Sequence, residues 1–148
     1  MTLRDTARVM SKQDSDVVRT NVQVVRGVYD GWGDGDVTRA LEYLDPGIVW
    51  EAIPDAPDAG TYRGHAGVRR YMEDWLGDFD SLGLDFEEII DEGERLVITQ
   101  CARATGKGSG AKTELDYAAA YRLEQGKIVE IREFRTKAEA LEAVGLSE

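Results

Sequence analysis

The first part of the chain places apolar residues three and four positions apart, the spacing that puts side chains on one face of a helix. The apolar positions are Val18, Val22, Val25, Val28, Tyr29 and Trp32. A helix is therefore predicted from Ser15 or Asp16, either of which can cap it, to the glycine-rich turn at residues 31–36.

Two more helices are predicted before the chain becomes strand-rich. The first is capped by Asp36 and ends at Asp45-Pro46, where proline cannot continue a helix. Its apolar positions are Val37, Ala40, Leu41 and Leu44. The second covers residues 65–76, and its apolar face consists of Val68, Tyr71, Met72 and Trp75.

The remaining segments alternate apolar and polar residues, the period of a half-buried β-strand. Strands are predicted over residues 47–53, 82–91, 95–105, 112–124 and 127–135. Residues 92–94 and 124–126 form tight hairpin turns, and the glycine-rich residues 105–111 form a wider connection. A last helix is expected to be capped by Thr136 and ended by Gly145.

This order of elements predicts an α+β fold, with three N-terminal helices, a strongly curved antiparallel sheet and a short C-terminal helix. Residues 1–14 are polar and are expected to form a flexible tail, and residues 15–148 a single domain.

The strand over residues 112–124 has the clearest alternation. One face, expected to look into the core or a cavity, carries Thr113, Leu115, Tyr117, Ala119, Tyr121 and Leu123. The other face has Ala118 and Ala120 at its centre, small enough to let another sheet approach.

Charge and cysteine content narrow the possible partners and location. The formal net charge of −11 disfavours nucleic-acid binding, because an acidic chain repels phosphate. Cys101 is the only cysteine and is expected to be a packed, inert thiol. No apolar segment is typical of a signal peptide or a membrane span, so a cytoplasmic location is expected.

Motifs for cofactors, metals and nucleophilic triads are not matched. The glycines at 106–110 lie between strands and lack the spacing of a phosphate-binding loop. His65 is the only histidine, and it begins a helix where its ring is expected to bond local backbone or carboxylate groups, with a place at the cavity mouth as the alternative. No cofactor or metal is therefore predicted.

The stretch from Asp45 to Trp75 resembles the SnoaL-like branch of the NTF2-like superfamily. A short apolar strand ends in Trp50-Glu51, a Pro/Asp/Gly loop follows, and Tyr62-Arg63-Gly64 leads into a helix of charged and aromatic residues. The resemblance implies a cone-shaped fold with a cavity, shared with ketosteroid isomerase and polyketide cyclases. It also implies a homodimer that forms through the sheet.

Ketosteroid isomerase is the nearest catalytic comparison that this resemblance offers. Matching the strands places Glu51 at the position of the isomerase base and turns Ile131 and Glu133 inward. Tyr117 is expected to assist from the neighbouring strand. Val28 and Ala119 stand where the isomerase has a tyrosine and a second acid, so its oxyanion hole is not carried over.

Two functions are compatible with these residues. One is binding of a small cyclic or polyketide-like metabolite, with cofactor-free acid–base catalysis by Glu51, Tyr117 and Glu133 of an isomerase, cyclase or epoxide-hydrolase type. The other is a non-catalytic ligand-binding or dimerisation module. The residues expected to line the cavity are Tyr29, Trp32, Trp50, Trp75, Ala119, Tyr121 and Ile131.

Each of the two glutamates also has a structural interpretation. Glu51 can lie on a strand edge facing water, and the aromatic residues can belong to the core. Glu133 can pair with Glu51 and share a proton, or it can form an ion pair with Arg103, Arg132 or Arg135.

Overall fold

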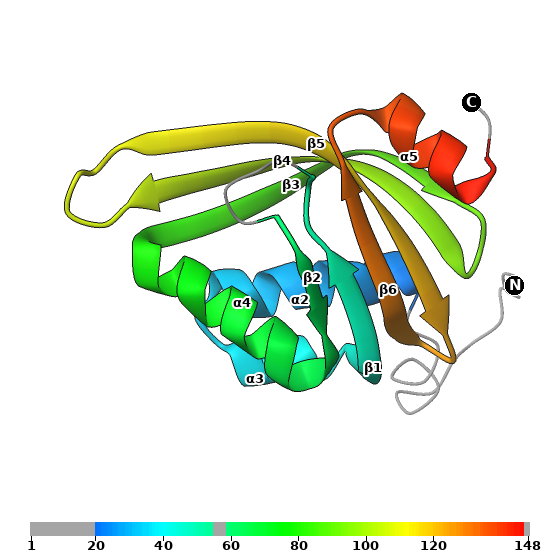
Figure 1. Ribbon diagram of the computed structural model, residues 1–148, viewed down its shortest axis with the longest axis horizontal. Helices are drawn as coiled ribbons and strands as arrows, with labels where there is room; N and C mark the ends of the chain where they lie inside the picture. The colour runs from blue at the N-terminus through cyan, green and yellow to red at the C-terminus, as the bar shows by residue number, and fades with distance from the viewer. Residues whose placement is uncertain (1–19, 55–58, 147–148) are drawn as a thin grey trace, which may run out of the picture.

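The computed structural model describes residues 20–54 and 59–146 (Figure 1). Their helices are α2 (Asn21–Gly33), α3 (Val37–Leu41), α4 (Gly64–Asp78) and α5 (Lys137–Val144). Their strands are β1 (Leu44–Glu51), β2 (Thr61–Arg63), β3 (Phe79–Asp91), β4 (Arg95–Gly106), β5 (Lys112–Glu124) and β6 (Lys127–Phe134). The α+β class is confirmed. No helix in these residues is long and apolar enough to cross a membrane.

Local signals account for most of the element boundaries. Asp36 caps α3, since its side chain accepts a hydrogen bond from the N–H of Arg39. Thr136 caps α5, and Gly145 ends it with a φ of 75°. The start predicted for the first helix, at residues 15–16, lies outside the described residues.

Two sequence interpretations near the first strand are corrected. Leu44 was expected to end the second helix, but it begins β1, which continues through Pro46. Residues 61–63 form the short strand β2, which pairs with the end of β1. Three residues are too few for alternation to reveal a strand, so only pairing with β1 identifies it.

The six strands form one sheet in the order β2-β1-β6-β5-β4-β3. Hairpins connect β3 with β4, β4 with β5 and β5 with β6. Each of these three pairs is antiparallel, as predicted. The expectation of a wholly antiparallel sheet is wrong at one place, because β1 pairs parallel with β6. These two strands are not joined by a hairpin, so no turn signal specifies their relative direction.

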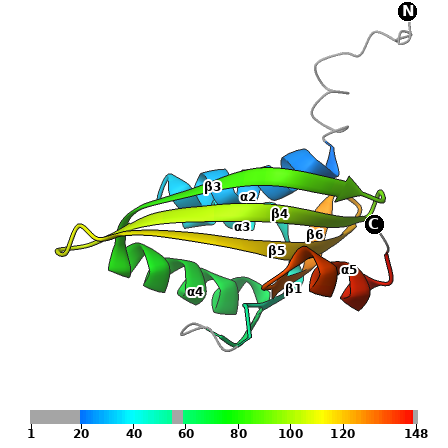
Figure 2. The ribbon, with the colours of Figure 1, turned by 90° about the horizontal axis from the view of Figure 1, so that it is seen from above.

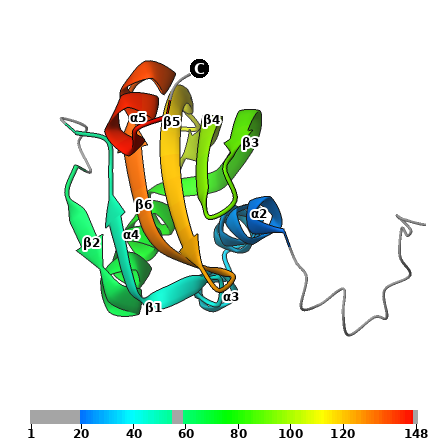
Figure 3. The same ribbon diagram turned by 90° about the vertical axis from the view of Figure 1, so that its right-hand side faces the viewer.

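The sheet curves strongly around α2 and α4, as the end-on view shows (Figure 3). Register shifts that interrupt β3 and the β5–β6 pair contribute to this bend. We call the concave side, which carries Tyr117, Ala119 and Tyr121, the inner face. It holds the main core together with α2, α3 and α4.

The opposite side, here called the outer face, is partly covered by α5 (Figure 2). Ala118 and Ala120 are buried there against Ala140 and Leu141 of the helix. The small side chains at the centre of β5 therefore accommodate a helix of the same chain, where another sheet was expected. Their small volume allows this close approach.

Candidate functional site

Strand register arranges the inner-face side chains in rows that cross the sheet. One row contains Phe86, Gln100 and Tyr117. The next contains Ile98, Ala119 and Glu133, and a third contains Leu96, Tyr121, Ile131 and Trp50. Glu133 thus faces inward, as predicted, because it lies directly opposite Ala119.

Glu133 is a buried carboxyl group, with only 7% of its surface exposed. Its Oε2 accepts a hydrogen bond from Trp50 Nε1 at 3.1 Å, and its Oε1 accepts one from the backbone N–H of Ile53 at 3.2 Å. The two donors fix the orientation of the carboxyl group.

Gln100 is at the centre of a hydrogen-bond network with three tyrosines of the inner-face core. Its Oε1 accepts a hydrogen bond from the hydroxyl of Tyr121, and its Nε2 donates to the hydroxyl of Tyr117 at 2.9 Å. The hydroxyls of Tyr29 and Tyr121 are 2.8 Å apart. Since Tyr121 donates to Gln100, Tyr29 donates to Tyr121. Gln100 is completely buried, so this network is internal.

The three phenols keep their protons at physiological pH. Burial, followed by the charge of Glu133, raises the pKa of Tyr29 above its ordinary value. Burial is also the main cause that raises the pKa of Tyr117 and of Tyr121, and Glu133 contributes to both. The site therefore combines a carboxyl group with neutral hydrogen-bond donors, the two kinds of group that general acid–base catalysis requires.

Exposure along β5 shows which end of the inner face is open to solvent. Leu115 is 45% exposed, Tyr117 is half-buried, and Ala119 and Tyr121 are buried. The long hairpin of β4 and β5 extends beyond α4 on this side (Figure 1). Tyr117 therefore lies between the open end of the inner face and its buried interior.

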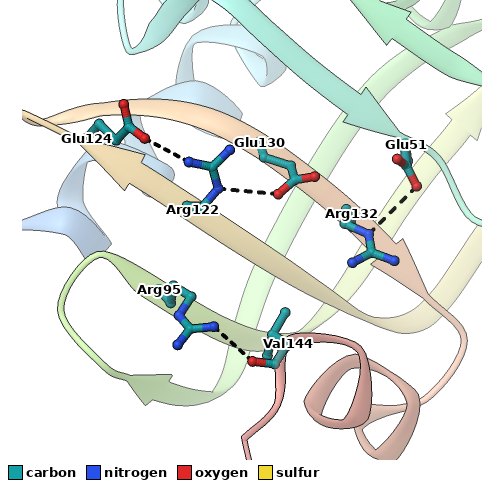
Figure 4. Close-up of polar contacts among 7 residues, drawn as sticks. All are labelled: Glu51, Arg95, Arg122, Glu124, Glu130, Arg132 and Val144. Atoms are coloured by element: carbon teal, nitrogen blue, oxygen red, sulfur yellow. Dashed lines mark hydrogen bonds and ion pairs between the residues drawn. The ribbon is translucent and has the colours of Figure 1, made fainter.

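Glu51 lies on the other side of the sheet. In the register of β1 with β6, Trp50 is opposite the inward Ile131 and Glu51 is opposite Arg132. The Glu51 side chain is 46% exposed, and its Oε1 is 3.7 Å from Arg132 Nε (Figure 4). The structure brings Glu133 and Tyr117 to one face and does not bring Glu51 to them.

The arginines considered as partners of Glu133 have contacts elsewhere. Arg132 faces Glu51, and Arg135 donates to the carbonyl of Pro54 at 3.1 Å. Arg103 forms ion pairs with Asp85 and Glu114 on the outer face. Figure 4 shows a similar outer-face contact, in which Arg122 reaches both Glu124 and Glu130.

The residues predicted to line a cavity all belong to, or pack against, the inner-face core: Tyr29, Trp32, Trp50, Trp75, Ala119, Tyr121 and Ile131. Trp32 contacts the rings of Trp50 and Trp75 edge-on, at centroid distances of 5.9 and 6.2 Å. Their clustering is consistent with a flat apolar guest, and the cavity itself stays a prediction.

Gln100 and the stacked pair Tyr62 and Tyr71, whose ring centroids are 4.3 Å apart, are not among the residues predicted from the sequence. A signal for Gln100 was present. It is the polar member of the alternating series Leu96, Ile98, Gln100, Ala102, so the period of β4 places it on an otherwise apolar face. The Tyr62–Tyr71 contact depends on β2 and has no local signal.

His65 and Cys101 contact or pack against the protein itself and lie outside the Glu133–tyrosine site. His65 Nε2 lies 2.8 Å from the carbonyl oxygen of Leu44, so its partner is backbone, but backbone 21 residues away in the chain where a local group is predicted. Cys101 is a buried free thiol, as expected. Across residues 20–54 and 59–146, no cluster of three or more His, Cys, Asp or Glu side chains is placed to hold a metal ion.

Comparison with known structures places the fold among NTF2-like proteins. An NTF2-like protein of unknown function from Burkholderia pseudomallei is 26% identical, with a TM-score of 0.68 over 84% of this chain and 97% of that one. TerC, co-crystallized with polyporic acid, is 21% identical, with a TM-score of 0.67 over 84% of this chain and 98% of TerC.

A putative polyketide cyclase from Xanthomonas campestris is 15% identical, with a TM-score of 0.62 over 80% of this chain and 92% of the cyclase. At such identities TerC and the cyclase are similar in fold alone. No curated protein matches the sequence.

The family comparison covers most of the site. The SnoaL-like domain matches residues 25–131, from the middle of α2 to β6, and includes Tyr29, Gln100, Tyr117 and Tyr121. Glu133 lies two residues beyond the matched range. The chain therefore belongs to the SnoaL-like domain family.

Proposed function

We propose that the protein binds a small ring-containing metabolite on the inner face of its sheet and transforms it by cofactor-free general acid–base catalysis. Glu133 is the proposed base and Tyr117 the proposed hydrogen-bond donor. The observation that carries this proposal is the buried Glu133 carboxyl group, held by two donors and facing a network of protonated phenols. An isomerase or cyclase type of reaction fits these groups.

In the proposed step, Glu133 takes a proton from a carbon next to a ligand carbonyl group. The electron pair of the broken C–H bond forms a C=C bond, and the carbonyl π electrons move to oxygen. Tyr117 donates a hydrogen bond to this developing oxyanion. Gln100 is a positioning residue, because its N–H donates to the Tyr117 oxygen and leaves the phenol proton for the ligand or for Tyr29.

This proposal assigns the base to Glu133 in preference to Glu51. A base must come within hydrogen-bond reach of the proton that it removes. A ligand on the inner face meets Glu133, while Glu51 is half-exposed on the outer face beside Arg132. Comparing the two glutamates by mutation therefore tests the assignment directly.

The test is deuterium exchange at the α-carbons of 2-tetralone, a neutral ring ketone, followed by NMR in D₂O against a buffer blank. Glu133→Gln is expected to reduce the enzyme-dependent rate by about 10²-fold or more, the usual contribution of a general base. Tyr117→Phe is expected to reduce it by a similar factor.

Glu51→Gln and the control Glu130→Gln should leave the rate within about twofold, since both side chains lie outside the inner face. Near-UV circular dichroism checks that each variant folds. If Glu51→Gln abolished exchange and Glu133→Gln did not, the assignment of the base would be wrong.

The alternative is a non-catalytic ligand-binding or dimerisation module. Ala119 favours it, because this buried position opposite Glu133 holds no second acid or base. Binding of 2-tetralone without exchange above the blank would support this alternative. We further propose a homodimer through the part of the outer face that α5 leaves uncovered, which sedimentation equilibrium can test.

A further inference from the structure

Building on the proposed function, we infer that Arg26 anchors a carboxylate group of the ligand, so that the protein prefers ring compounds that carry an ionised carboxylic acid. The inference concerns the charge of the ligand, which neither the family nor the fold specifies. It follows from the contacts of Arg26 and from the row of apolar side chains beside it.

Arg26 lies on α2, and its guanidinium group packs over the inner face of the edge strand β3. Its Nη1 donates a hydrogen bond to the carbonyl oxygen of Leu84 at 2.9 Å, and its Cζ lies 3.8 Å from the centroid of the Phe86 ring. Stacking on a ring and bonding to a carbonyl group fix the plane of the guanidinium group. The side chain is half-buried, so this group is held in place and still reaches solvent.

The positive charge of Arg26 has no carboxylate partner within residues 20–54 and 59–146. Three arginines of these residues are half-buried, namely Arg26, Arg69 and Arg132. Arg69 lies 3.6 Å from Glu73 and Arg132 lies 3.7 Å from Glu51, whereas no described carboxylate is within ion-pair distance of Arg26. Burying part of a cation without an anion is unfavourable, so an anion from outside the chain gains a partner here.

The guanidinium group also has N–H donors left for such an anion. It carries five N–H donors, and the bond to Leu84 occupies one of them. A carboxylate can accept two parallel N–H···O bonds from a guanidinium group, and these charge-assisted bonds are stronger than bonds between neutral groups. A ketone oxygen carries no charge to compensate the cation. Arg26 therefore favours a carboxylate over a ketone of the same shape.

The inner face beside Arg26 offers an apolar surface for the rings of the ligand. Leu84 lies opposite Ala102 of β4, and Ala102 lies opposite Leu115 of β5. Leu84 and Ala102 are partly exposed, and Leu115 is 45% exposed. Neighbouring strands are about 5 Å apart, so this row extends about 10 Å across the sheet. It ends beside Tyr117, the next inward residue along β5.

A ligand whose carboxylate binds Arg26 therefore extends its rings over this row toward Tyr117. The two ends of the row have different tasks. Arg26 binds the charge, while Tyr117 donates a hydrogen bond to an oxygen at the far end of the ligand. The proposed reaction takes place at the far end, so a ligand without a carboxylate still reacts but binds more weakly. Arg26 is thus a residue that determines specificity.

The experiment compares 2-naphthoate with 2-acetylnaphthalene, which share a ring system and have side groups of similar size. Dissociation constants are measured by calorimetry or ligand-observed NMR at pH 7.5, where the naphthoate is ionised. An ionic strength of about 0.15 M screens the field of the acidic chain beyond about 8 Å. The wild-type protein is expected to bind the naphthoate at least about tenfold more tightly, as hydrogen bonds to a charged group provide.

The variants test whether Arg26 causes this preference. Arg26→Gln should reduce the ratio of the two affinities to within about twofold by weakening naphthoate binding alone. Arg69→Gln is the matched control, because it removes the same charge from a half-buried arginine that contacts Glu73, and it should preserve the ratio. Arg26→Lys keeps the charge but cannot form both bonds of the planar fork, so its ratio should lie between these values. Near-UV circular dichroism checks that each variant folds, and Arg26→Lys replaces Arg26→Gln if the latter does not.

Three results would overturn the inference, and they separate it from the proposed function. Equal affinities in the wild-type protein would refute the carboxylate anchor while leaving a ring-binding site intact. A preference that survives both substitutions of Arg26, or that Arg69→Gln reduces equally, would show that Arg26 is not its cause. Failure of both compounds to bind would overturn the proposed ring-binding function, and the inference with it.

Discussion

Raising the pH from 8 to 11 is expected to destabilise the fold by about 4 kcal/mol through the buried Tyr29 and Tyr121 and the half-buried Tyr117. The pKa values of Tyr29, Tyr117 and Tyr121 are all raised, first by burial and then by nearby phenols and Glu133. In the unfolded chain the same phenols ionise near pH 10. Between about pH 10 and the raised pKa values of the folded state, the folded protein keeps phenol protons that the unfolded chain releases.

The sign and size follow from this difference in bound protons. Above about pH 10 the unfolded state binds fewer protons, so the free energy of unfolding falls as the pH rises. The stabilisation is fully present below pH 10 and is lost as the pH rises toward the folded-state pKa values. At pH 11 one phenol of ordinary pKa in the unfolded state accounts for about 1.4 kcal/mol, and three account for about 4 kcal/mol. That is a large fraction of a typical domain stability of about 5–15 kcal/mol.

Urea unfolding, followed by tryptophan fluorescence at several pH values and constant ionic strength, measures this loss. Tyr121→Phe should reduce the loss between pH 8 and pH 11 by about one third, whatever the mutation does to stability at pH 8. Burial also raises the pKa of Cys101. Both proteins contain this cysteine, so its contribution cancels when the pH dependence of the unfolding free energy of Tyr121→Phe is compared with that of the wild-type protein.

The absorbance of tyrosinate at 295 nm gives an independent check, because three of the six tyrosines should ionise only on unfolding. Two results would refute the reasoning. One is an unfolding free energy that does not change between pH 8 and pH 11. The other is ionisation of all six tyrosines near pH 10 while the near-UV circular dichroism of the folded state persists.

Two further predictions concern the scaffold. Gly31→Ala should destabilise the protein by about 1–3 kcal/mol, because the new Cβ would lie 2.9 Å from the backbone nitrogen of Ala40. Gly77→Ala is the matched control, because nothing lies within 4 Å of its new Cβ, and it should stabilise the protein by up to about 1 kcal/mol. Equal effects of the two substitutions on urea unfolding would contradict the packing argument. Thr136→Ala should lower stability by about 1 kcal/mol, because the N–H of Glu139 loses its acceptor at 3.2 Å, and an unchanged melting temperature would show that this cap is dispensable.

Local patterns in the sequence were sufficient for most elements and for part of the site. The alternation in β5 places Tyr117, Ala119 and Tyr121 on one face, and the structure confirms it. The turn before β6 is also local, since Gln125 and Gly126 both have positive φ, as a two-residue hairpin turn requires. The inward direction of Glu133 was inferred from the family resemblance, and the pairing of β6 with β5 supports it.

Tertiary structure alone decided which groups meet. Two hydrogen bonds of Glu133 come from Trp50 and Ile53, about 80 residues away in the chain, through the parallel pairing of β1 with β6. The same pairing turns Trp50 inward and Glu51 outward. Side chains alternate along a strand, so a difference of one residue in register moves a carboxylate from one face to the other.

The sequence by itself determined the class of fold, most element boundaries and the pattern of faces on each strand, because these depend on residues close together in the chain. Only the folded structure determined the strand order, the environment of the two glutamates and the network around Gln100. These depend on the register between strands that are distant in sequence, and a periodic pattern within one strand contains no information about its register with another.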